Sequence, residues 1–384
     1  RQRQMCIRDR NMAVLPMMPE KLQIKVIPQT GKQYHAVTTQ LARKDVGEVV
    51  IATDAGREGE LVARWILDKA HNQKPCKRLW ISSVTDKAIR EGFASLKDAK
   101  EYDNLYRAAV SRAEADWLVG INATRALTCK YNAQLSCGRV QTPTLAMIAQ
   151  REQEIREFVP KPYYTVTAAA GGAVYTWKDE KSGGTRISDP EKAKQIAEKA
   201  KRYPLVLQKV EKKKKQKEAP LLYDLTELQR DASARFGYSA KQTLNLMQSL
   251  YETHKVLTYP RTDSRYLTKD IVPTLKERLD AVSIGPYKTL AQQAKRRPLK
   301  EKPGFVNDAK VSDHHAIIPT EQYVQLSALS NEERRIYDLV VRRFLAVLLP
   351  PCVYEETVIQ ASIEKECFTA RGTVSYTHLR AHET

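Results

Sequence analysis

The chain has 384 residues and a formal net charge of +19, from 64 Lys and Arg against 45 Asp and Glu. This excess of positive charge is unusual for a cytosolic metabolic enzyme and predicts binding to a polyanion. Apolar residues make up 42% of the sequence, so hydrophobic cores can form and global disorder is excluded. No apolar run reaches the ~18–20 residues that cross a bilayer, and the six cysteines form no C-x-x-C pair. We therefore expect a soluble protein of about two to four domains in a reducing, cytoplasmic compartment, without a disulfide scaffold or zinc ribbon.

The two ends of the chain, 1–10 and 375–384, show neither an apolar period nor capping residues. Both resemble translated sequencing-adapter sequence. We expect them to be non-native segments at either side of a truncated protein, and they carry no weight in predicting the fold.

The first part of the chain alternates strands with helices. A β-branched run at 48–53 ends in a turn rich in carboxylates and is followed by a helix at 60–69. A strand at 78–82 and a helix at 85–96 come next, and this order predicts an α/β domain with a parallel sheet. Apolar residues at a spacing of three to four, without proline, predict a long helix over 101–127.

The middle of the chain has strand-like alternation and a basic run. Alternating segments occur at 163–167, 174–177 and 205–210. Asp189 and Pro190 open a helix that runs through 198, as cap and first-turn residue. The basic run 212–217 is either a linker or a solvated strand end.

A second helical region follows. Two helices and an extended piece are expected in succession, at 224–236, 240–253 and 255–259. Gly237 stops the first helix and Ser239 caps the second. Helix, tight turn, helix and strand is the plan of a winged helix-turn-helix unit. A further amphipathic helix is expected over 331–349, before a Pro-Pro pair.

The acidic turn, residues 54–60, is the strongest chemical cluster of the first domain. Its carboxylates follow a predicted parallel strand, and the C-terminal ends of such strands face an open crevice. Asp54 and Glu58 are hard oxygen ligands that suit Mg²⁺, which typically uses one or two carboxylates plus substrate phosphate. The alternative is a helix N-terminus that carries glutamates for its dipole, and spacing alone does not separate the two.

The tyrosine segment, residues 257–264, reads LTYPRTDS. In an extended chain Arg261 projects to the same face as Tyr259, two residues before it. A guanidinium there could hold a phosphodiester and favour the phenolate, which would make Tyr259 a nucleophile. Without these neighbours, Tyr259 would be interpreted as a packed aromatic at a strand end.

Four stretches together resemble the type IA DNA topoisomerases, and they occur in that family's order. They read ATDAGREGELVARWIL at 52–67, LSCGRVQT at 135–142, LTYPRTDS at 257–264 and SDHHAIIPT at 312–320. The resemblance extends over about 21–372 and points to the bacterial topoisomerase III branch. In two respects the chain departs from the family pattern. Gly56 stands where the second aspartate of the acidic motif usually lies, and the opening strand with a catalytic Glu-Lys pair has no counterpart.

The resemblance implies that Tyr259 attacks a phosphodiester and forms a 5′-phosphotyrosyl bond. It implies that Arg261 steadies the scissile phosphate. Adjacent histidines such as His314 and His315 seldom bind the same metal ion. We therefore prefer a phosphate contact or a proton relay near Tyr259 as their role, and we favour His314 for it.

For the acidic turn the resemblance implies Mg²⁺ as the cofactor, with Asp54 and Glu58 as ligands and Glu58 also counted among the catalytic residues. Because Gly56 removes one carboxylate, one metal ion and two metal ions both remain open.

The resemblance also implies a DNA-binding surface. Gly138 lets the backbone approach phosphate, while neighbouring side chains supply hydrogen-bond donors. On the predicted long helix Trp117 and Arg125 are eight residues apart and share a face, so they could stack a base and hold a phosphate. The alternative is that Trp117 packs in a core and Arg125 pairs with Glu114 or solvent. The expected DNA-binding residues are Arg112, Trp117, Arg125, Ser136, Gly138, Arg139, Val140, Gln141 and Arg261.

By the same resemblance the fold class is multidomain α/β plus α+β, with a TOPRIM-like domain and helical, β-arch and winged-helix-like domains that form a toroidal clamp. The expected domains are an incomplete TOPRIM domain at 11–101, a helical DNA-binding domain at 102–160, the first part of a β-rich arch at 161–222, a winged-helix-like domain with the catalytic tyrosine at 223–352, and the returning arch at 353–374.

The function implied is an ATP-independent DNA topoisomerase, an isomerase that cuts, passes and religates a strand of single-stranded or underwound DNA. We expect a monomer in the bacterial cytoplasm, associated with the nucleoid and not with a membrane. A competing hypothesis is an impaired fragment that only binds single-stranded DNA. A TOPRIM primase or nuclease would not need the tyrosine segment and is disfavoured.

Overall fold

The computed structural model describes residues 11–20, 22–81, 86–297 and 304–375. The terminal segments predicted to be non-native therefore lie outside the described residues, apart from Ser375, which ends a strand. The chain divides into two compact units. Unit 1 combines the residues up to Phe158 with Arg261–Pro273 and Val306–Ala316, and unit 2 holds Val159–Pro260, Thr274–Phe305 and the residues from Ile317 on. Within the described ranges no helix has the length and apolar character needed to span a membrane.

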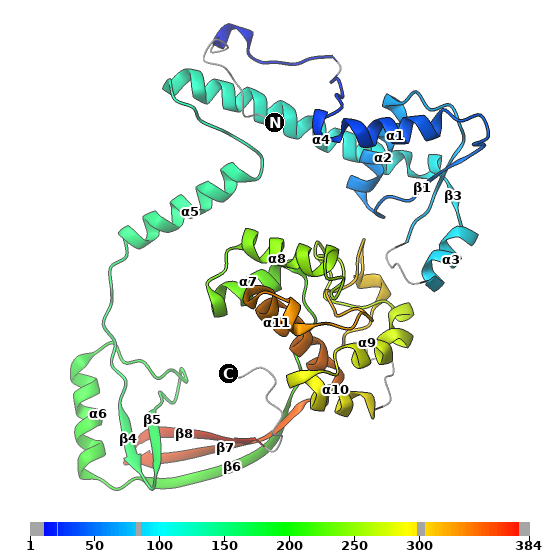
Figure 1. Cartoon of the computed structure of the whole chain (residues 1–384). Helices are drawn as coiled ribbons and strands as arrows, with labels where there is room; N and C mark the ends of the chain where they lie inside the picture. The colour runs from blue at the N-terminus through cyan, green and yellow to red at the C-terminus, as the bar shows by residue number, and fades with distance from the viewer. Residues whose placement is uncertain (1–10, 21, 82–85, 298–303, 376–384) are drawn as a thin grey trace. The chain divides into compact units, whose positions relative to one another are not determined.

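Unit 1 contains a three-stranded sheet. Strand β1 (Val49–Ile51) pairs in parallel with β2 (Cys76–Arg78), and helix α2 (Arg57–Lys69) connects them (Figure 1). The edge strand β3 (Lys97–Asp98) pairs antiparallel with β2. The prediction of an α/β unit with parallel strands is thus confirmed.

Strand β2 lies earlier in the chain than the predicted strand at 78–82. The apolar run after Arg78 suggested a strand at 78–82, but the ladder ends at Arg78 because its partner β1 ends at Ile51. Residue 82 lies outside the described residues. Helix α2 also begins three residues before the predicted 60–69. The next helix, α3 (Asp86–Ala94), matches the predicted 85–96, of which residue 85 is not described.

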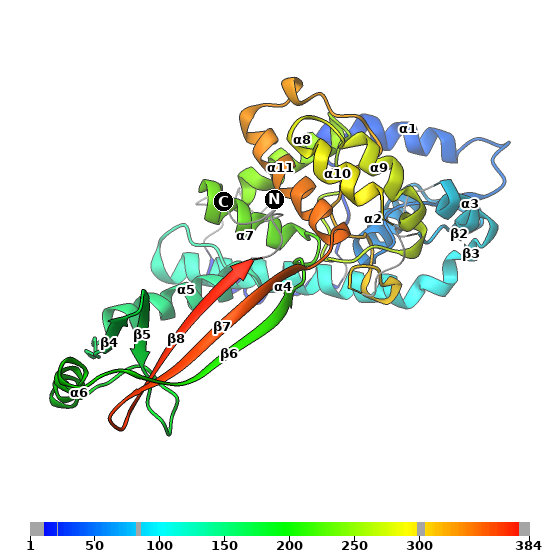
Figure 2. The same ribbon diagram turned by 90° about the horizontal axis from the view of Figure 1, so that it is seen from below.

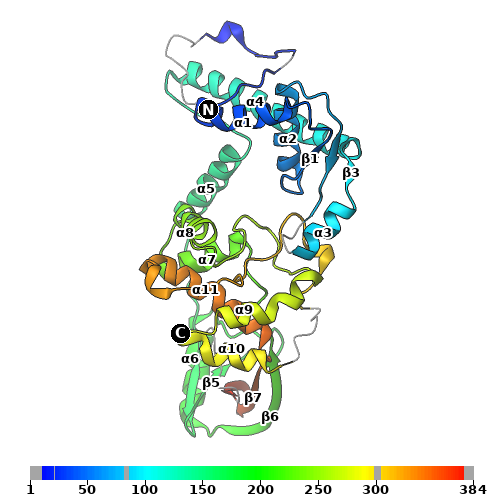
Figure 3. The ribbon, with the colours of Figure 1, turned by 45° about the vertical axis from the view of Figure 1, so that its right-hand side comes forward.

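Two long helices follow in unit 1. Helix α4 (Asp103–Tyr131) packs against α2, as Figure 3 shows, and ends at Asn132 in the left-handed conformation. The helix predicted at 101–127 therefore starts after a 3-10 turn and continues for another turn. The second long helix, α5 (Gln141–Arg156), is exposed along its whole length. A shorter helix, α1 (Gly31–Leu41), comes before the sheet in the chain.

Unit 2 contains a five-stranded antiparallel sheet in the order β4-β5-β8-β7-β6 (Figure 2). Its strands are β4 (Thr167–Ala170), β5 (Ala173–Trp177), β6 (Val206–Lys217), β7 (Cys352–Ile363) and β8 (Glu366–Ser375). Helix α6 (Pro190–Arg202) packs on the sheet, and Trp177, Ile196 and Phe368 are buried between them. Packing in this core holds strands β5, β7 and β8 in one sheet although they are far apart in the sequence.

One prediction for this sheet needs correction, and a pair of alternatives is resolved. The strand predicted at 163–167 lies later, because Gly171 and Gly172, both with positive φ, form the turn that sets the β4–β5 register. For the basic run 212–217, the solvated strand end is the alternative that is confirmed, because these exposed residues form the end of β6. Its lysines pair across to β7, and Lys215 Nζ lies 2.6 Å from Glu356 Oε2.

The helices of unit 2 follow their local signals closely. Helices α7 (Leu225–Phe236) and α8 (Ala240–Glu252) are separated by Gly237, whose φ is 70°, and by the cap Ser239. The predicted extended piece makes a bridge from Leu257 to Pro319. The remaining helices are α9 (Leu275–Ala281), α10 (Lys288–Lys295) and α11 (Asn331–Leu348). Short 3-10 turns lie at Met12–Val14, Pro28–Thr30, Ala99–Tyr102, Lys269–Thr274, Gly285–Tyr287, Asp308–Lys310 and Leu326–Ala328.

Candidate active site

The acidic turn leads from β1 into α2 and separates its carboxylates into two kinds. The side chains of Asp54 and Glu58 are 62% and 72% exposed, so they are accessible to a ligand. Glu60 is fully buried and pairs with Arg64 and Arg78 at 2.9 Å each. Glu60 therefore holds the fold together, while the Asp54 and Glu58 side chains lie on the surface of the turn.

Arg78 holds the backbone of the acidic turn, and the sequence did not single it out. Its fully buried side chain donates from Nε to Glu60 Oε2 at 2.9 Å. It also donates from Nη1 to the Thr53 carbonyl at 2.8 Å and from Nη2 to the Asp54 carbonyl at 2.6 Å. Burial lowers the pKa of Arg78, and the Glu60 carboxylate opposes that shift. The sequence contains no signal for this role, because the carbonyls to which Arg78 donates come together only in the fold.

The two glycines of the turn permit close approaches. A Cβ on Gly59 would overlap the Asp54 carbonyl oxygen, so a side chain there would displace the turn. A Cβ on Gly56 would overlap the Asp313 carboxylate, lying 2.8 Å from its Cγ and 3.0 Å from its Oδ1. Both glycines are thus explained by space and not by a left-handed backbone.

The histidine segment reaches the acidic turn within unit 1. His314 Nε2 lies 3.9 Å from Asp54 Oδ1, whereas the His315 ring contacts the Ala316 carbonyl through Nδ1 at 2.7 Å. Desolvation raises the pKa of Asp313 although the residue stays exposed; His314 opposes the shift, and the carboxylates of Asp263 and Asp54 add to it. The geometry brings His314, the favoured histidine, beside a predicted metal ligand.

The segment after the tyrosine is anchored to the histidine segment. Thr262 Oγ1 donates to the His314 carbonyl at 2.8 Å, and Ser312 Oγ donates to Asp263 Oδ1 at 2.9 Å. Arg261, which directly precedes Thr262, is exposed. These bonds connect the histidine segment with the residues that follow Tyr259.

Tyr259 lies in unit 2, at the end of the extended piece. The preceding residue, Thr258, donates its backbone N–H to the Ile318 carbonyl at 2.9 Å. The Tyr259 ring meets the Tyr251 ring edge-on, with centroids 5.5 Å apart. Tyr259 is half-buried, which is compatible with a phenol that a substrate can reach.

Two of the predicted DNA-binding arginines, Arg112 and Arg139, are held by carboxylates. Arg112 Nη1 lies 2.8 Å from Glu58 Oε1, and Arg139 forms an ion pair with Asp116. Both arginines are on exposed surface, so a nucleic-acid phosphate could replace their acidic partners. The Asp116 pair also lowers the pKa of that carboxyl group.

The LSCGRVQT segment is fixed to α4 by two buried threonines that the sequence did not single out. Thr124 Oγ1 accepts from the Cys137 backbone N–H at 2.9 Å, and Thr128 Oγ1 donates to the Leu135 carbonyl at 3.1 Å. Ser136 and the residues from Arg139 to Gln141 are exposed, Gly138 is half-exposed, and Trp117 and Arg125 are half-buried on α4. Their assignment to DNA stays a prediction.

The donor set of the acidic turn fits Mg²⁺. Asp54 and Glu58 present the hard oxygen atoms that this ion prefers, and the space a side chain on Gly56 would fill already holds a carboxylate from Asp313. Within the described ranges, however, no three acidic, histidine or cysteine side chains are already grouped closely enough to hold a metal.

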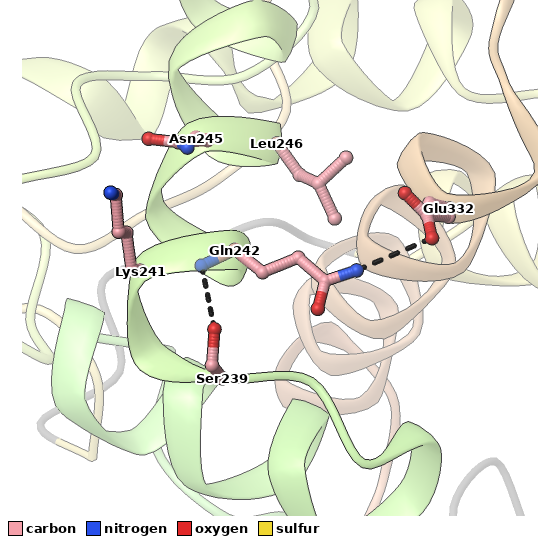
Figure 4. A pocket seen from close by; sticks show the side chains of 6 residues that line it. All are labelled: Ser239, Lys241, Gln242, Asn245, Leu246 and Glu332. Carbon is pink, nitrogen blue, oxygen red and sulfur yellow. Dashed lines mark hydrogen bonds between the residues drawn. The ribbon is translucent and has the colours of Figure 1, made fainter.

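A separate hollow of about 400 Å³ lies in unit 2, away from all of these motifs in sequence. Figure 4 shows it at the start of α8, where Gln242 Nε2 donates to Glu332 Oε1 at 3.2 Å. It is lined by Ser239, Lys241, Gln242, Asn245, Leu246 and Glu332. None of these was a predicted site residue.

Comparison with known proteins connects this geometry to a family. A DNA topoisomerase family model matches residues 100–378, and a Toprim domain model matches residues 9–84. The chain is 60% identical over 358 residues to DNA topoisomerase 3 of Bacillus subtilis (strain 168), which covers 93% of this chain and 49% of that protein. It is 58% identical over 363 residues to a DNA topoisomerase 3 of Bacillus cereus, covering 94% and 50%.

A solved structure, full-length topoisomerase I from Thermotoga maritima, matches with a TM-score of 0.67 and 25% identity, covering 92% of this chain and 57% of that one. The chain spans about half the length of the curated relatives it matches. Taken with the Toprim match, the structural likeness supports a type IA topoisomerase fold. The chain therefore belongs to the type IA DNA topoisomerases and is similar to their bacterial topoisomerase III branch.

Proposed function

We propose that the full-length protein is an ATP-independent DNA topoisomerase that opens one DNA strand at Tyr259, passes another strand through the gap and reseals it. The observation that carries this proposal is the meeting, within unit 1, of Asp54 with His314 and of His314 with the segment that follows Tyr259. Family membership and the high identity to DNA topoisomerase 3 support it.

In the cleavage step the Tyr259 phenolic oxygen attacks the phosphorus of a phosphodiester and loses its proton. A 5′-phosphotyrosyl ester forms as the bond to the 3′-oxygen breaks, and that oxygen leaves with a proton. One ester replaces another, so religation is the reverse reaction and needs no ATP. His314, held near the Asp54 carboxylate, is suited to carry a proton at the leaving oxygen.

Charge at the phosphate needs compensation. Arg261 is the exposed guanidinium two residues after the nucleophile and can hold the scissile phosphate in a bidentate manner. Asp54 and Glu58 would hold Mg²⁺, which when bound supplies positive charge next to phosphate oxygens. A net charge of +19 favours approach of single-stranded or underwound DNA.

At the level of architecture we propose that α7, α8 and the following extended piece form a winged-helix-like domain that carries Tyr259. The sheet that includes β6, β7 and β8 would form an arch, and the domains together would form a toroidal clamp. We further propose a monomer that works in the bacterial cytoplasm at the nucleoid; the similarity to DNA topoisomerase 3 of a bacterium is compatible with this location.

The test is covalent trapping in the full-length protein. With Mg²⁺ and a labelled single-stranded oligonucleotide, wild type should give a protein–DNA adduct that survives denaturing electrophoresis. Tyr259→Phe should give none and should still bind the oligonucleotide. Tyr251→Phe is the matched control, because Tyr251 contacts the Tyr259 ring and should not be the nucleophile, so its adduct should persist.

Two results would count against the proposal. Adducts formed by Tyr259→Phe would refute the choice of nucleophile. A wild-type protein that shifts oligonucleotides and never cleaves them would favour the competing function, a single-stranded DNA-binding module.

A further inference from the structure

Strand β6 of unit 2 carries six lysines that the candidate site does not use. It ends the strand order β4-β5-β8-β7-β6, so its outer edge has no neighbouring strand among the described residues. We propose that one face of β6 is a track for the phosphates of single-stranded DNA, formed by residues other than those assigned above to cleavage, metal binding or DNA binding. The inference rests on the proposed function, because it assigns a further surface to the same substrate.

The lysine-rich half of β6 takes no part in the hydrophobic core. Along this strand only Glu211 is half-buried, and the other residues are exposed. The buried β7 residues Ala361 and Ile363 lie beside the first residues of β6, whereas 212–217 pair with 352–357. Figure 2 shows β6, β7 and β8 running away from α6 toward this end. Apolar packing therefore does not account for these lysines, and their side chains are open to solvent.

Alternation along the strand sorts these lysines into two rows. This part of the β6–β7 ladder is regular, and successive side chains of a strand point to opposite faces. Lys213, Lys215 and Lys217 therefore share one face and form what we call the lysine row, while Lys212 and Lys214 lie on the other face. Residues two apart in a strand are about 6.6 Å apart, a spacing comparable to that of successive phosphates along an extended nucleic-acid strand.

Cations outnumber carboxylates on the face of the lysine row. Glu356 lies 2.6 Å from Lys215 Nζ and 3.6 Å from Arg371 Nε. Hydrogen bonds from Lys209 and Lys213 lower the pKa of Glu211 to about 2. Each carboxylate is thus shared by two cations, and among the described residues no carboxylate pairs with Lys217. The positive charge left over on this face is available to phosphates. The cations of the face are Lys209, Lys213, Lys215, Lys217 and Arg371.

Lysines on an edge strand also prevent it from pairing with another strand. That role requires positive charge along the edge and no ligand, so it predicts that DNA leaves the reactivity of these lysines unchanged. An acidic polypeptide is the other ligand that a row of cations attracts. The test therefore has to separate DNA from polyglutamate.

Acetylation footprinting of the full-length wild type, measured by mass spectrometry, tests the lysine row directly. Without Mg²⁺, so that the strand stays intact, bound oligo(dT) should slow acetylation of Lys213, Lys215 and Lys217 by at least about threefold, because phosphates would cover their ammonium groups. Lys212 and Lys214 should react as in the free protein. Polyglutamate of equal charge should protect the row less than oligo(dT) does.

A triple variant measures what the lysine row contributes to affinity. Lys213→Gln, Lys215→Gln and Lys217→Gln combined should weaken oligo(dT) binding by about tenfold or more. The slope of log affinity against log salt concentration should fall by about 2 in magnitude, since each phosphate contact to a single strand contributes ~0.7. The matched control should keep the wild-type slope. It replaces by glutamine three exposed lysines of unit 2 outside β6, namely Lys181, Lys194 and Lys201.

The inference is overturned if oligo(dT) protects both faces of β6 equally or protects neither, if polyglutamate protects the row as well as oligo(dT) does, or if the triple variant and its control lose the same affinity. In each of these cases a wild type that forms the Tyr259 adduct leaves the proposed function standing. Conversely, face-specific protection in a protein that forms no adduct would keep the track and refute cleavage. If the triple variant associates through its uncharged edge, the footprint of the wild type still decides.

Discussion

Replacing Arg78 should loosen the acidic turn while every residue proposed to take part in the reaction keeps its own side chain. Arg78 is fully buried and serves as a common donor for the turn. Its guanidinium hydrogen-bonds the Glu60 carboxylate and the backbone carbonyls of Ile51, Thr53, Asp54 and Leu79. We expect Arg78→Met, which keeps an unbranched apolar stem of similar volume, to destabilise this part of unit 1.

The magnitude follows from what the substitution leaves behind. Removing one partner of a buried ion pair typically costs about 3–5 kcal/mol, because the other charge stays buried. Glu60 keeps a second cation, since Arg64 Nε lies 2.9 Å from its Oε1. The carbonyls of Ile51 and Asp54 keep backbone donors from Leu79 and Gly56. We therefore expect the lower end of the range, about 3 kcal/mol.

Hydrogen exchange of the α2 amides is the suitable assay, because it reports the opening free energy of this element separately from unit 2. Arg78→Met should lower that free energy by about 3 kcal/mol. Arg64→Met is the matched control. It removes the other cation from Glu60, but its side chain is 18% exposed and it does not donate to the turn, so the loss should be smaller. Protection in Arg78→Met within about 1 kcal/mol of wild type would refute the assigned role of the buried pair.

Two further predictions concern exposed and partly buried charges. Arg112→Ala should free Glu58 from its cation and raise Mn²⁺ affinity about two- to fivefold, as expected for an exposed pair. The same variant should bind DNA more weakly, as measured by the fluorescence anisotropy of a labelled oligonucleotide. Unchanged metal affinity would contradict a competition between Arg112 and the ion. Burial tends to raise the pKa of Glu366, but Lys199 and the Trp177 N–H outweigh it and the pKa lies below its usual range. The stability that this carboxylate contributes is therefore present above the unfolded pKa of ~4.3 and is lost as pH falls through the folded pKa. In urea denaturation, the free energies of unfolding of wild type and Glu366→Gln should differ at pH 7 and should converge at about pH 3. A gap that stays constant with pH would contradict the ion pair as its cause.

Elements with local signals could be placed from the sequence to within about a residue. Helices α7 and α8 begin and end at Asp224, Gly237 and Ser239, whose side chains or backbone freedom act within a few residues of themselves. The same holds for α11, where Ser330 and Glu333 form a capping box. These signals need no knowledge of the rest of the chain.

Strands were less predictable because their limits are set by distant partners. Strand β2 ends where its pairing with β1 ends, so the end of β2 cannot be found from the residues of β2 alone. The basic half of β6 could not be separated from a linker, because Glu355 and Glu356, which lie near its lysines, come more than a hundred residues later. The Gly171-Gly172 turn was a local signal that the predicted strand limits did not take into account.

The same division applies to the candidate site. Asp54, Tyr259 and His314 could be singled out because each lies in a motif of its own. Arg78 could not, since a buried arginine is recognised only when the carbonyls it serves are seen around it. The missing side chain at Gly56 and the carboxylate of Asp313 are separated by more than two hundred and fifty residues, and only the fold brings them together.

This separation changes how a departure from a motif should be interpreted. Taken within its own turn, Gly56 suggests a weakened metal site. In the folded chain the position cannot accept a side chain while Asp313 keeps its place, so the glycine and the aspartate form one arrangement. It follows that replacing Gly56 alone by aspartate should not improve the site, because the new carboxylate would enter space already held by another.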